Sequence, residues 1–167
     1  MKPFLITSAL LFTSIAVTAQ AKAPADKTPT QTPTTVITAQ AQQAERNKKL
    51  VTDFYNGVFQ KHQVKAYSDQ YIGTEYIQHN PYVPNGKAPF VNYFTQYFKE
   101  NPLAKSVIKR AAAEGDLVYL HVHSQQNPQD RGVAVVDIFR VENGKIVEHW
   151  DVQQDVPAES ANQNTMF

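Results

Sequence analysis

The sequence predicts an α+β domain: a cone-shaped half-barrel in which a strongly curved antiparallel sheet wraps around N-terminal helices and encloses a cavity. Three observations lead to this expectation. Apolar residues recur with a helical period in the first half of the domain, between residues 41 and 98. Four longer strands joined by turns follow, between residues 106 and 153. Some of these strands are apolar on both faces, so each face of the sheet needs a cover.

Residues 1–21 are expected to form a cleaved secretory signal peptide. Lys2 precedes an apolar run over residues 4–17 that is short for a membrane span, and Ala19-Gln20-Ala21 has the small-x-small pattern of a signal-peptidase site. Residues 21–23 offer a second cleavage site, and a retained N-terminal anchor is the alternative. The segment therefore predicts a periplasmic or secreted protein that has no membrane contact after cleavage.

The rest of the chain is expected to divide into a linker, one domain and a tail. Residues 22–38 are rich in Pro, Thr, Ala and Gln without an apolar period, which indicates a disordered linker. Residues 39–156 have the length of one domain, and residues 157–167 form a C-terminal tail. The absence of cysteine excludes a lipid-anchored N-terminus and a disulfide framework.

The charge balance argues against two classes of partner. Cleavage of the signal would remove Lys2 and leave 15 Lys and Arg against 15 Asp and Glu. A formally neutral protein lacks the positive field that attracts nucleic acid or an anionic membrane surface. We therefore expect neither as a partner.

The domain is expected to open with helices. Residues 41–59 carry an apolar stripe that includes Leu50, Phe54 and Val58, and a shorter helix is expected over residues 64–70. Residues 71–79 predict a short strand, ended by Asn80-Pro81. A third helix over residues 89–98 begins with a proline in its first turn and has a wide aromatic face.

Four strands are expected after these helices, over residues 106–114, 116–124, 132–141 and 145–153. The segment 133–138 is apolar on both faces apart from one aspartate. Helices can cover one face of such a sheet, and in a domain of this size we expect a second copy of the chain to cover the outer face. The sequence therefore predicts a homodimer formed through the outer sheet face.

The last two strands form a hairpin that carries Asp137, His149 and Asp151. A two-residue Asn143-Gly144 turn would place Asp137 and Asp151 on opposite faces of the sheet. A three-residue turn, with Gly144 as a left-handed bulge residue, would pair position 141 with position 145. Asp137 would then lie across from His149, with Asp151 on the same face. We favour this second register.

Several segments resemble the SnoaL-like polyketide cyclases of the nuclear-transport-factor-2-like superfamily. They are Y-I-Q-H-N-P at residues 76–81, P-N-G at residues 84–86 and D-I-F-R-V-E-N-G-K-I-V-E-H-W-D at residues 137–151. The resemblance covers essentially all of residues 48–156. The tail over residues 162–167 is similar to that of bacterial SnoaL-like proteins of unassigned substrate. The resemblance implies that Asp151, on the last strand, acts as acid and base in an intramolecular aldol closure.

One departure from the family pattern keeps the reaction open. A histidine commonly faces the catalytic aspartate from the preceding strand, whereas this sequence has Asp137. Two neighbouring carboxylates in a poorly hydrated pocket cannot both ionise freely, so one of them could act as an acid. We expect Asp151 to be the general base and acid, with Asp137 and His149 as its partners.

Other side chains are expected to bind the substrate in the same cavity. His121 and His123 lie two apart on one strand and so share a face. Together with a carboxylate they could instead hold a metal ion, or they could simply be polar residues on the wetter face of a strand. The expected substrate-binding residues are His79, Asn80, His121, His123, Tyr55, Phe94 and Trp150.

These expectations favour a lyase or isomerase that acts on a small, hydrophobic carbonyl-containing ligand. No nucleotide or flavin motif is present, so the sequence implies no organic cofactor, and we assign no metal ligand. Fold does not decide function in this superfamily. The competing hypothesis is a non-catalytic module that binds a small molecule or peptide, and a third is a metal-dependent relative.

Overall fold

The computed structural model describes residues 33–167 and shows an α+β fold, as the sequence predicts. The elements in chain order are α1 (Pro33–Phe59), α2 (Val64–Tyr71), β1 (Ile72–Gln78), α3 (Lys87–Glu100), β2 (Lys105–Glu114), β3 (Leu117–Gln125), β4 (Val133–Glu142) and β5 (Lys145–Asp155). Helix α1 begins inside the segment expected to be a linker. The predicted signal peptide and the rest of that linker lie outside the described residues. No helix in residues 33–167 is long and apolar enough to cross a membrane.

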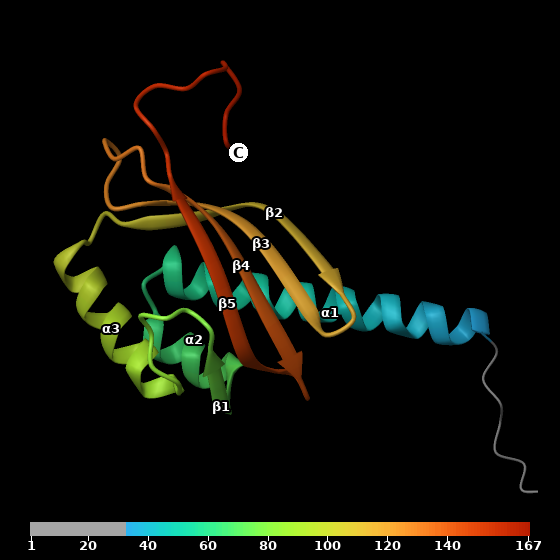
Figure 1. Ribbon diagram of the computed structural model, residues 1–167. Coiled ribbons are helices and arrows are strands. Elements are labelled where there is room, and N and C mark those ends of the chain that lie inside the picture. Colours follow the sequence, from blue (N-terminus) through green and yellow to red (C-terminus); the bar gives the residue numbers. More distant parts are fainter. Residues whose placement is uncertain (1–32) are drawn as a thin grey trace, which may run out of the picture. The chain divides into compact units, whose positions relative to one another are not determined.

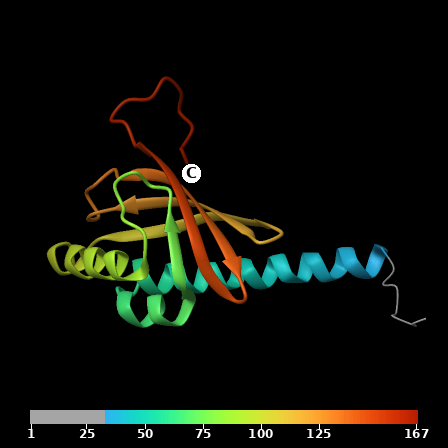
Figure 2. The same ribbon diagram turned by 60° about the horizontal axis from the view of Figure 1, so that its bottom comes forward.

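The sheet has five strands in the order β1-β5-β4-β3-β2. Neighbouring strands are antiparallel except β1, which pairs with β5 in parallel, so the expectation of a purely antiparallel sheet is wrong. The strong curvature expected of a half-barrel is also absent. The sheet is open, with β1 and β2 as its two edges. Figures 1 and 2 show all three helices on one face of this sheet.

The core lies between the helices and the inner sheet face. In α1 the buried apolar side chains follow a helical spacing, at Val51, Phe54, Tyr55 and Val58. Phe54 packs against the rings of α3 and β4, with its ring centroid 5.9 Å from that of Phe90 and 6.1 Å from that of Phe139. This aromatic layer holds α3 beside the sheet, and it forms one wall of the cavity described below.

The outer sheet face carries most of the exposed apolar side chains of the sheet. Val107, Val136 and Val152 are 40, 38 and 68% exposed. No helix in residues 33–167 covers this face (Figure 2). The homodimer that the sequence predicts through this face stays a prediction.

Candidate active site

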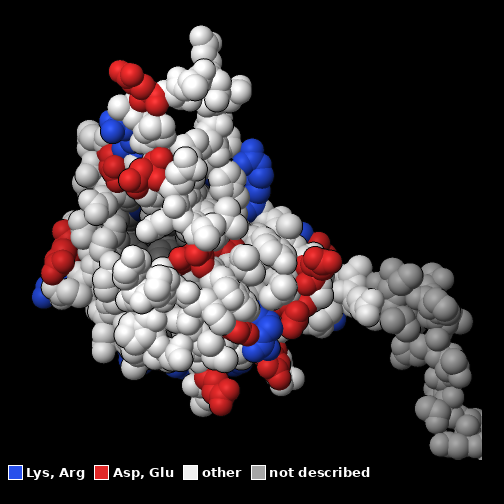
Figure 3. All heavy atoms as spheres, viewed as in Figure 1, with Lys and Arg blue, Asp and Glu red and all other residues white. Residues whose placement is uncertain are grey.

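A cavity of about 910 Å³ lies between the inner sheet face and helices α1 and α3. Figure 3 shows the molecular surface hollowed on the side of α3 and β5. The aromatic wall comes from both helices, and the polar groups come from all five strands and from the loop between β3 and β4. The wall includes Phe54, Tyr55, Phe59, Phe90, Phe94 and Phe98, and the polar groups at one end include Gln78, Asn80, Asp137, His149 and Asp151.

The turn between β4 and β5 has two residues, Asn143 and Gly144. Both have positive φ, 51° and 71°, as a type I′ turn requires. Glu142 pairs with Lys145 across this turn. The three-residue turn predicted from the sequence, which would pair Val141 with Lys145, is therefore wrong.

A β-bulge in β5 nevertheless brings the three ionisable groups to one face. The register shifts at Val147, so beyond it Phe139 pairs with His149 and Asp137 pairs with Asp151. One extra residue in a strand moves every later side chain to the other face. The prediction that Asp137, His149 and Asp151 share a face is confirmed, although His149 lies diagonally across from Asp137 rather than opposite it.

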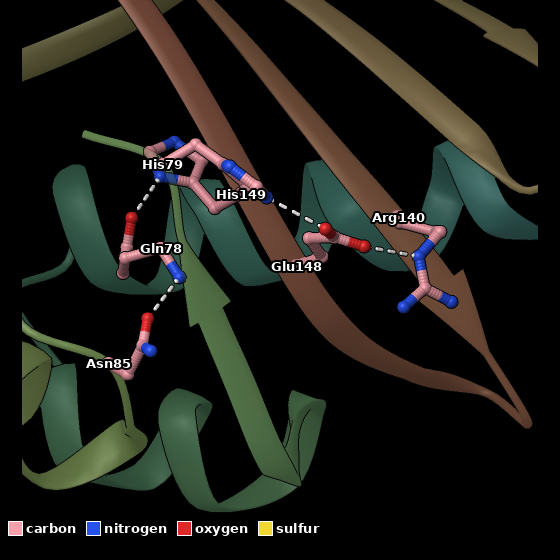
Figure 4. Close-up of polar contacts among 6 residues, drawn as sticks. All are labelled: Gln78, His79, Asn85, Arg140, Glu148 and His149. Carbon is pink, nitrogen blue, oxygen red and sulfur yellow. Dashed lines mark hydrogen bonds and ion pairs between the residues drawn. The ribbon is translucent and has the colours of Figure 1, made fainter.

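Asp137 and His149 form a buried, hydrogen-bonded pair. Nε2 of His149 lies 3.0 Å from Oδ1 of Asp137, and the two residues are 8 and 6% exposed. The hydroxyl of Tyr55 donates to the other carboxylate oxygen, Oδ2, at 3.0 Å. On the far side of the ring, Nδ1 of His149 lies 2.8 Å from Oε1 of Gln78 in β1 (Figure 4). The pair, which joins β4 to β5, is therefore fixed by side chains from two further elements, α1 and β1.

Asp151 completes the set and faces the cavity more openly. Nδ2 of Asn80 lies 2.9 Å from both of its carboxylate oxygens. One side-chain atom each of Asp137, His149 and Asp151 lie within 4.8 Å of one another. Both oxygens of Asp137 already accept hydrogen bonds, whereas those of Asp151 share a single amide and keep lone pairs for a ligand. Asp151 is thus the carboxylate better placed to take a proton from a bound molecule.

Two tyrosines near the pair are held in the neutral form. Burial raises the pKa of Tyr55 well above its usual range, and the charge of Asp137 adds to the shift. Burial also raises the pKa of Tyr76, again with help from Asp137, while the nearby Gln78 amide opposes part of the change. The Tyr76 hydroxyl makes no hydrogen bond of normal geometry within residues 33–167. Both phenols therefore keep their protons at neutral pH.

These raised pKa values predict an alkaline loss of stability. The two phenols stay protonated in the folded protein but ionise above about pH 10 in the unfolded chain, so stability is intact below pH 10 and falls as the pH rises further. Tyr76→Phe should be close to neutral at pH 7 and should reduce the alkaline loss. Urea unfolding at pH 8 and pH 11 measures both effects, and an equal alkaline loss in the variant would contradict this assignment.

The fold agrees with that of known proteins. A model of the SnoaL-like domain matches residues 51–149, more than half of the chain. The chain belongs to the SnoaL-like domain family. Among curated proteins, no sequence matches it.

Solved structures similar to this SnoaL-like domain include three bacterial proteins. A candidate polyketide cyclase from Bacillus cereus is 19% identical, with 67% of this chain and 76% of that chain covered and a TM-score of 0.57. A candidate ketosteroid isomerase from Kribbella flavida is 12% identical, with 72 and 86% covered and a TM-score of 0.56. A nuclear-transport-factor-2-like protein of unknown function from Mesorhizobium loti is 22% identical, with 67 and 93% covered and a TM-score of 0.56. At these identities the likeness shows the fold.

In this SnoaL-like domain, two residues expected in the cavity lie outside it. His79 stacks on Trp150 with ring centroids 4.5 Å apart and the planes within 4° of parallel. Its Nε2 lies 2.7 Å from Oε1 of Glu148, whose other oxygen accepts from Arg140 at 2.6 Å (Figure 4). The hydrogen bond from His79 lowers the pKa of Glu148 the most, and the hydrogen bond from Arg140 lowers it further. The expectation that His79 and Trp150 face the cavity is wrong, because neither lines it, and their roles in substrate binding stay untested predictions.

His121 and His123 also lie on the wrong side of the sheet. His121 pairs with Val136, whereas its neighbour Leu120 pairs with Asp137 on the inner face. Both histidine rings stack on Phe167 of the C-terminal tail, with ring centroids 5.6 and 4.2 Å from that of Phe167. The expectation that these two side chains converge on the cavity is therefore wrong.

The remaining expected residues do meet at the site, and the structure adds another. Tyr55, Phe94 and Asn80 line the cavity, as predicted. Gln78, which the sequence analysis missed, orients His149. The alternation of side chains along an extended segment could have identified it. Gln78 and Asn80 are two residues apart and so point to the same side, whereas His79 between them points to the other. Only one member of the His79-Asn80 pair could face inward.

Proposed function

We propose that this SnoaL-like domain is an acid–base catalyst for a small, largely apolar carbonyl compound. The supporting observation is the buried Asp137–His149 pair beside Asp151 at the polar end of a cavity with an aromatic wall. Enclosed carboxylate and imidazole groups that converge on one point are what proton transfer requires. A module that only binds apolar ligands needs the aromatic wall but not this set.

In the proposed reaction, Asp151 takes the proton from the carbon next to the substrate carbonyl. The electrons of the broken C–H bond form the enolate. In an aldol closure the enolate carbon attacks a second carbonyl of the same molecule, and the new alkoxide takes the proton back from Asp151. In an isomerisation the proton returns to a different carbon. Asp137 and His149, which are hydrogen-bonded to each other beside Asp151, act on the charge of Asp151 through space.

The cavity supports the expected class of substrate. Rings from α1 and α3 form its wall, so an apolar body gains free energy by leaving water there. The carbonyl then reaches the end where Asn80 and Asp151 lie. We infer as well that the protein is exported, on the strength of residues 1–21, which lie outside the described residues.

The test detects proton transfer itself, whatever product the reaction forms. A panel of aromatic and alicyclic ketones and diketones is screened for compounds that raise the melting temperature, and each stabilising compound is then incubated with the protein in D₂O. We expect at least one of them to lose its α-proton signal in the NMR spectrum faster than without protein. If every stabilising ligand keeps its α-protons, the catalytic proposal fails and the binding-module alternative gains support.

A further inference from the structure

The three side chains at the polar end of the cavity also have the composition of a metal site. One imidazole nitrogen and two carboxylates offer ligand atoms within 4.8 Å of one another. Imidazole and carboxylate together suit zinc, manganese or iron(II) rather than the all-oxygen sites of magnesium and calcium. The neighbouring cavity leaves space for water or a ligand to complete the coordination.

Each of the three candidate ligands is held by a second polar group. His149 is oriented by Gln78, Asp137 by the Tyr55 hydroxyl and Asp151 by the Asn80 amide, at 2.8, 3.0 and 2.9 Å. Metal-binding histidines and carboxylates are regularly fixed by such outer partners, which set the ring tautomer and hold the ligand atoms in place. The three donors thus need little reorganisation to bind a cation.

The contact with Gln78 fixes the His149 ring so that Nε2 faces Asp137. Nδ1 lies 2.8 Å from Oε1 of Gln78, which leaves Nε2 as the ring nitrogen available to a cation. Nε2 lies 3.0 Å from Oδ1 of Asp137, a separation at which both atoms can bind the same ion.

The surrounding charge favours a cation as well. Asp137 and Asp151 are directly paired across β4 and β5, where like charges repel. No lysine or arginine in the described part of the chain forms an ion pair with either carboxylate, and His149 is the sole ion-pair partner there. A divalent cation would neutralise both carboxylates at once.

We propose that Asp137, His149 and Asp151 bind one divalent cation of the zinc class. The cation occupies the carboxylate of Asp151 that would accept the substrate proton, so it blocks the proposed acid–base reaction. This inference goes beyond the proposed function and does not depend on any substrate. It also moves the candidate metal site away from His121 and His123, which the sequence had suggested.

The test is calorimetric titration of zinc chloride into protein that carries no polyhistidine tag and has been stripped with a chelator. We expect one zinc ion per chain, and His149→Gln should weaken binding at least tenfold. Gln78→Leu keeps all three ligands and should weaken it by about 10–100-fold, which preserves the test if His149→Gln does not fold. The matched control is His121→Gln with His123→Gln on the outer face, which should bind zinc as the wild type does.

Two outcomes would overturn the proposal. One is a wild-type protein that binds no zinc at one per chain. The other is binding that survives both cavity variants but disappears in the outer-face double variant. The α-proton exchange assay is run on the same chelator-treated protein, so zinc binding without exchange would reject the proposed function alone.

Discussion

Asp151→Asn is expected to slow proton transfer from a bound carbonyl compound by about 10²–10⁴-fold while the compound still binds. The amide has nearly the same shape as the carboxylate, but it cannot accept a proton at neutral pH. Asp137 should not replace it, because His149 and Tyr55 already occupy its two oxygens. The aromatic wall is unchanged in the variant, so the effect should appear in kcat rather than in the dissociation constant of the ligand.

The matched control for this variant is Asp155→Asn. Asp155 lies four residues further along β5, where it lines an exposed part of the cavity and forms no hydrogen bond to Asp137, His149 or Asp151. The same chemical change at this position should leave the exchange rate within about twofold of wild type, since the change lies outside the proton-transfer set. Equal rates in the wild type and in Asp151→Asn would remove Asp151 from the mechanism.

Asp137→Ala is expected to lower the free energy of unfolding by about 3–5 kcal/mol. The substitution deprives the buried His149 ring and the Tyr55 hydroxyl of their shared acceptor. It also leaves a small void at a position that is only 6% exposed. An unpaired buried donor loses its interaction with water and gains nothing in return, so the loss exceeds that of an exposed pair.

Urea unfolding at neutral pH measures this loss, and Asp137→Asn provides the comparison. The asparagine keeps the volume and one carbonyl acceptor, so it should lose less stability than the alanine. A loss below about 1 kcal/mol in Asp137→Ala would indicate an exposed pair rather than a buried one.

The elements of the fold could largely be predicted from the sequence, whereas the pairing of its strands could not. Helical spacing of apolar residues located α1 and α3, and alternation located the strands. The parallel contact of β1 with β5 depends on how α1 and α2 direct the chain, which no local pattern records. Because the local patterns do not record this pairing, we expected a wholly antiparallel and strongly curved sheet.

Asp137 and Asp151 share a face, as predicted, but the strand register from which this was predicted is wrong. The favoured bulge at Gly144 is absent, and the actual bulge at Val147 has the same effect on Asp137 and Asp151. Bulges depend on the packing of both sheet faces, so turn residues alone do not locate them. By contrast, the outward position of His121 and His123 could have been predicted from the sequence, because the apolar residues Val118, Leu120 and Val122 alternate with them. In the structure these three apolar side chains are fully buried.

The contact on which the proposed chemistry depends most directly is the hydrogen bond between Asp137 and His149. Nitrogen NMR of the histidine rings tests it without a substrate, at one fixed pH, in the wild type and in Asp137→Asn. We predict that the substitution changes the ring resonances of His149 and leaves those of His121 and His123, on the other face of the sheet, in place. His149 resonances that do not respond to Asp137→Asn would contradict the paired site.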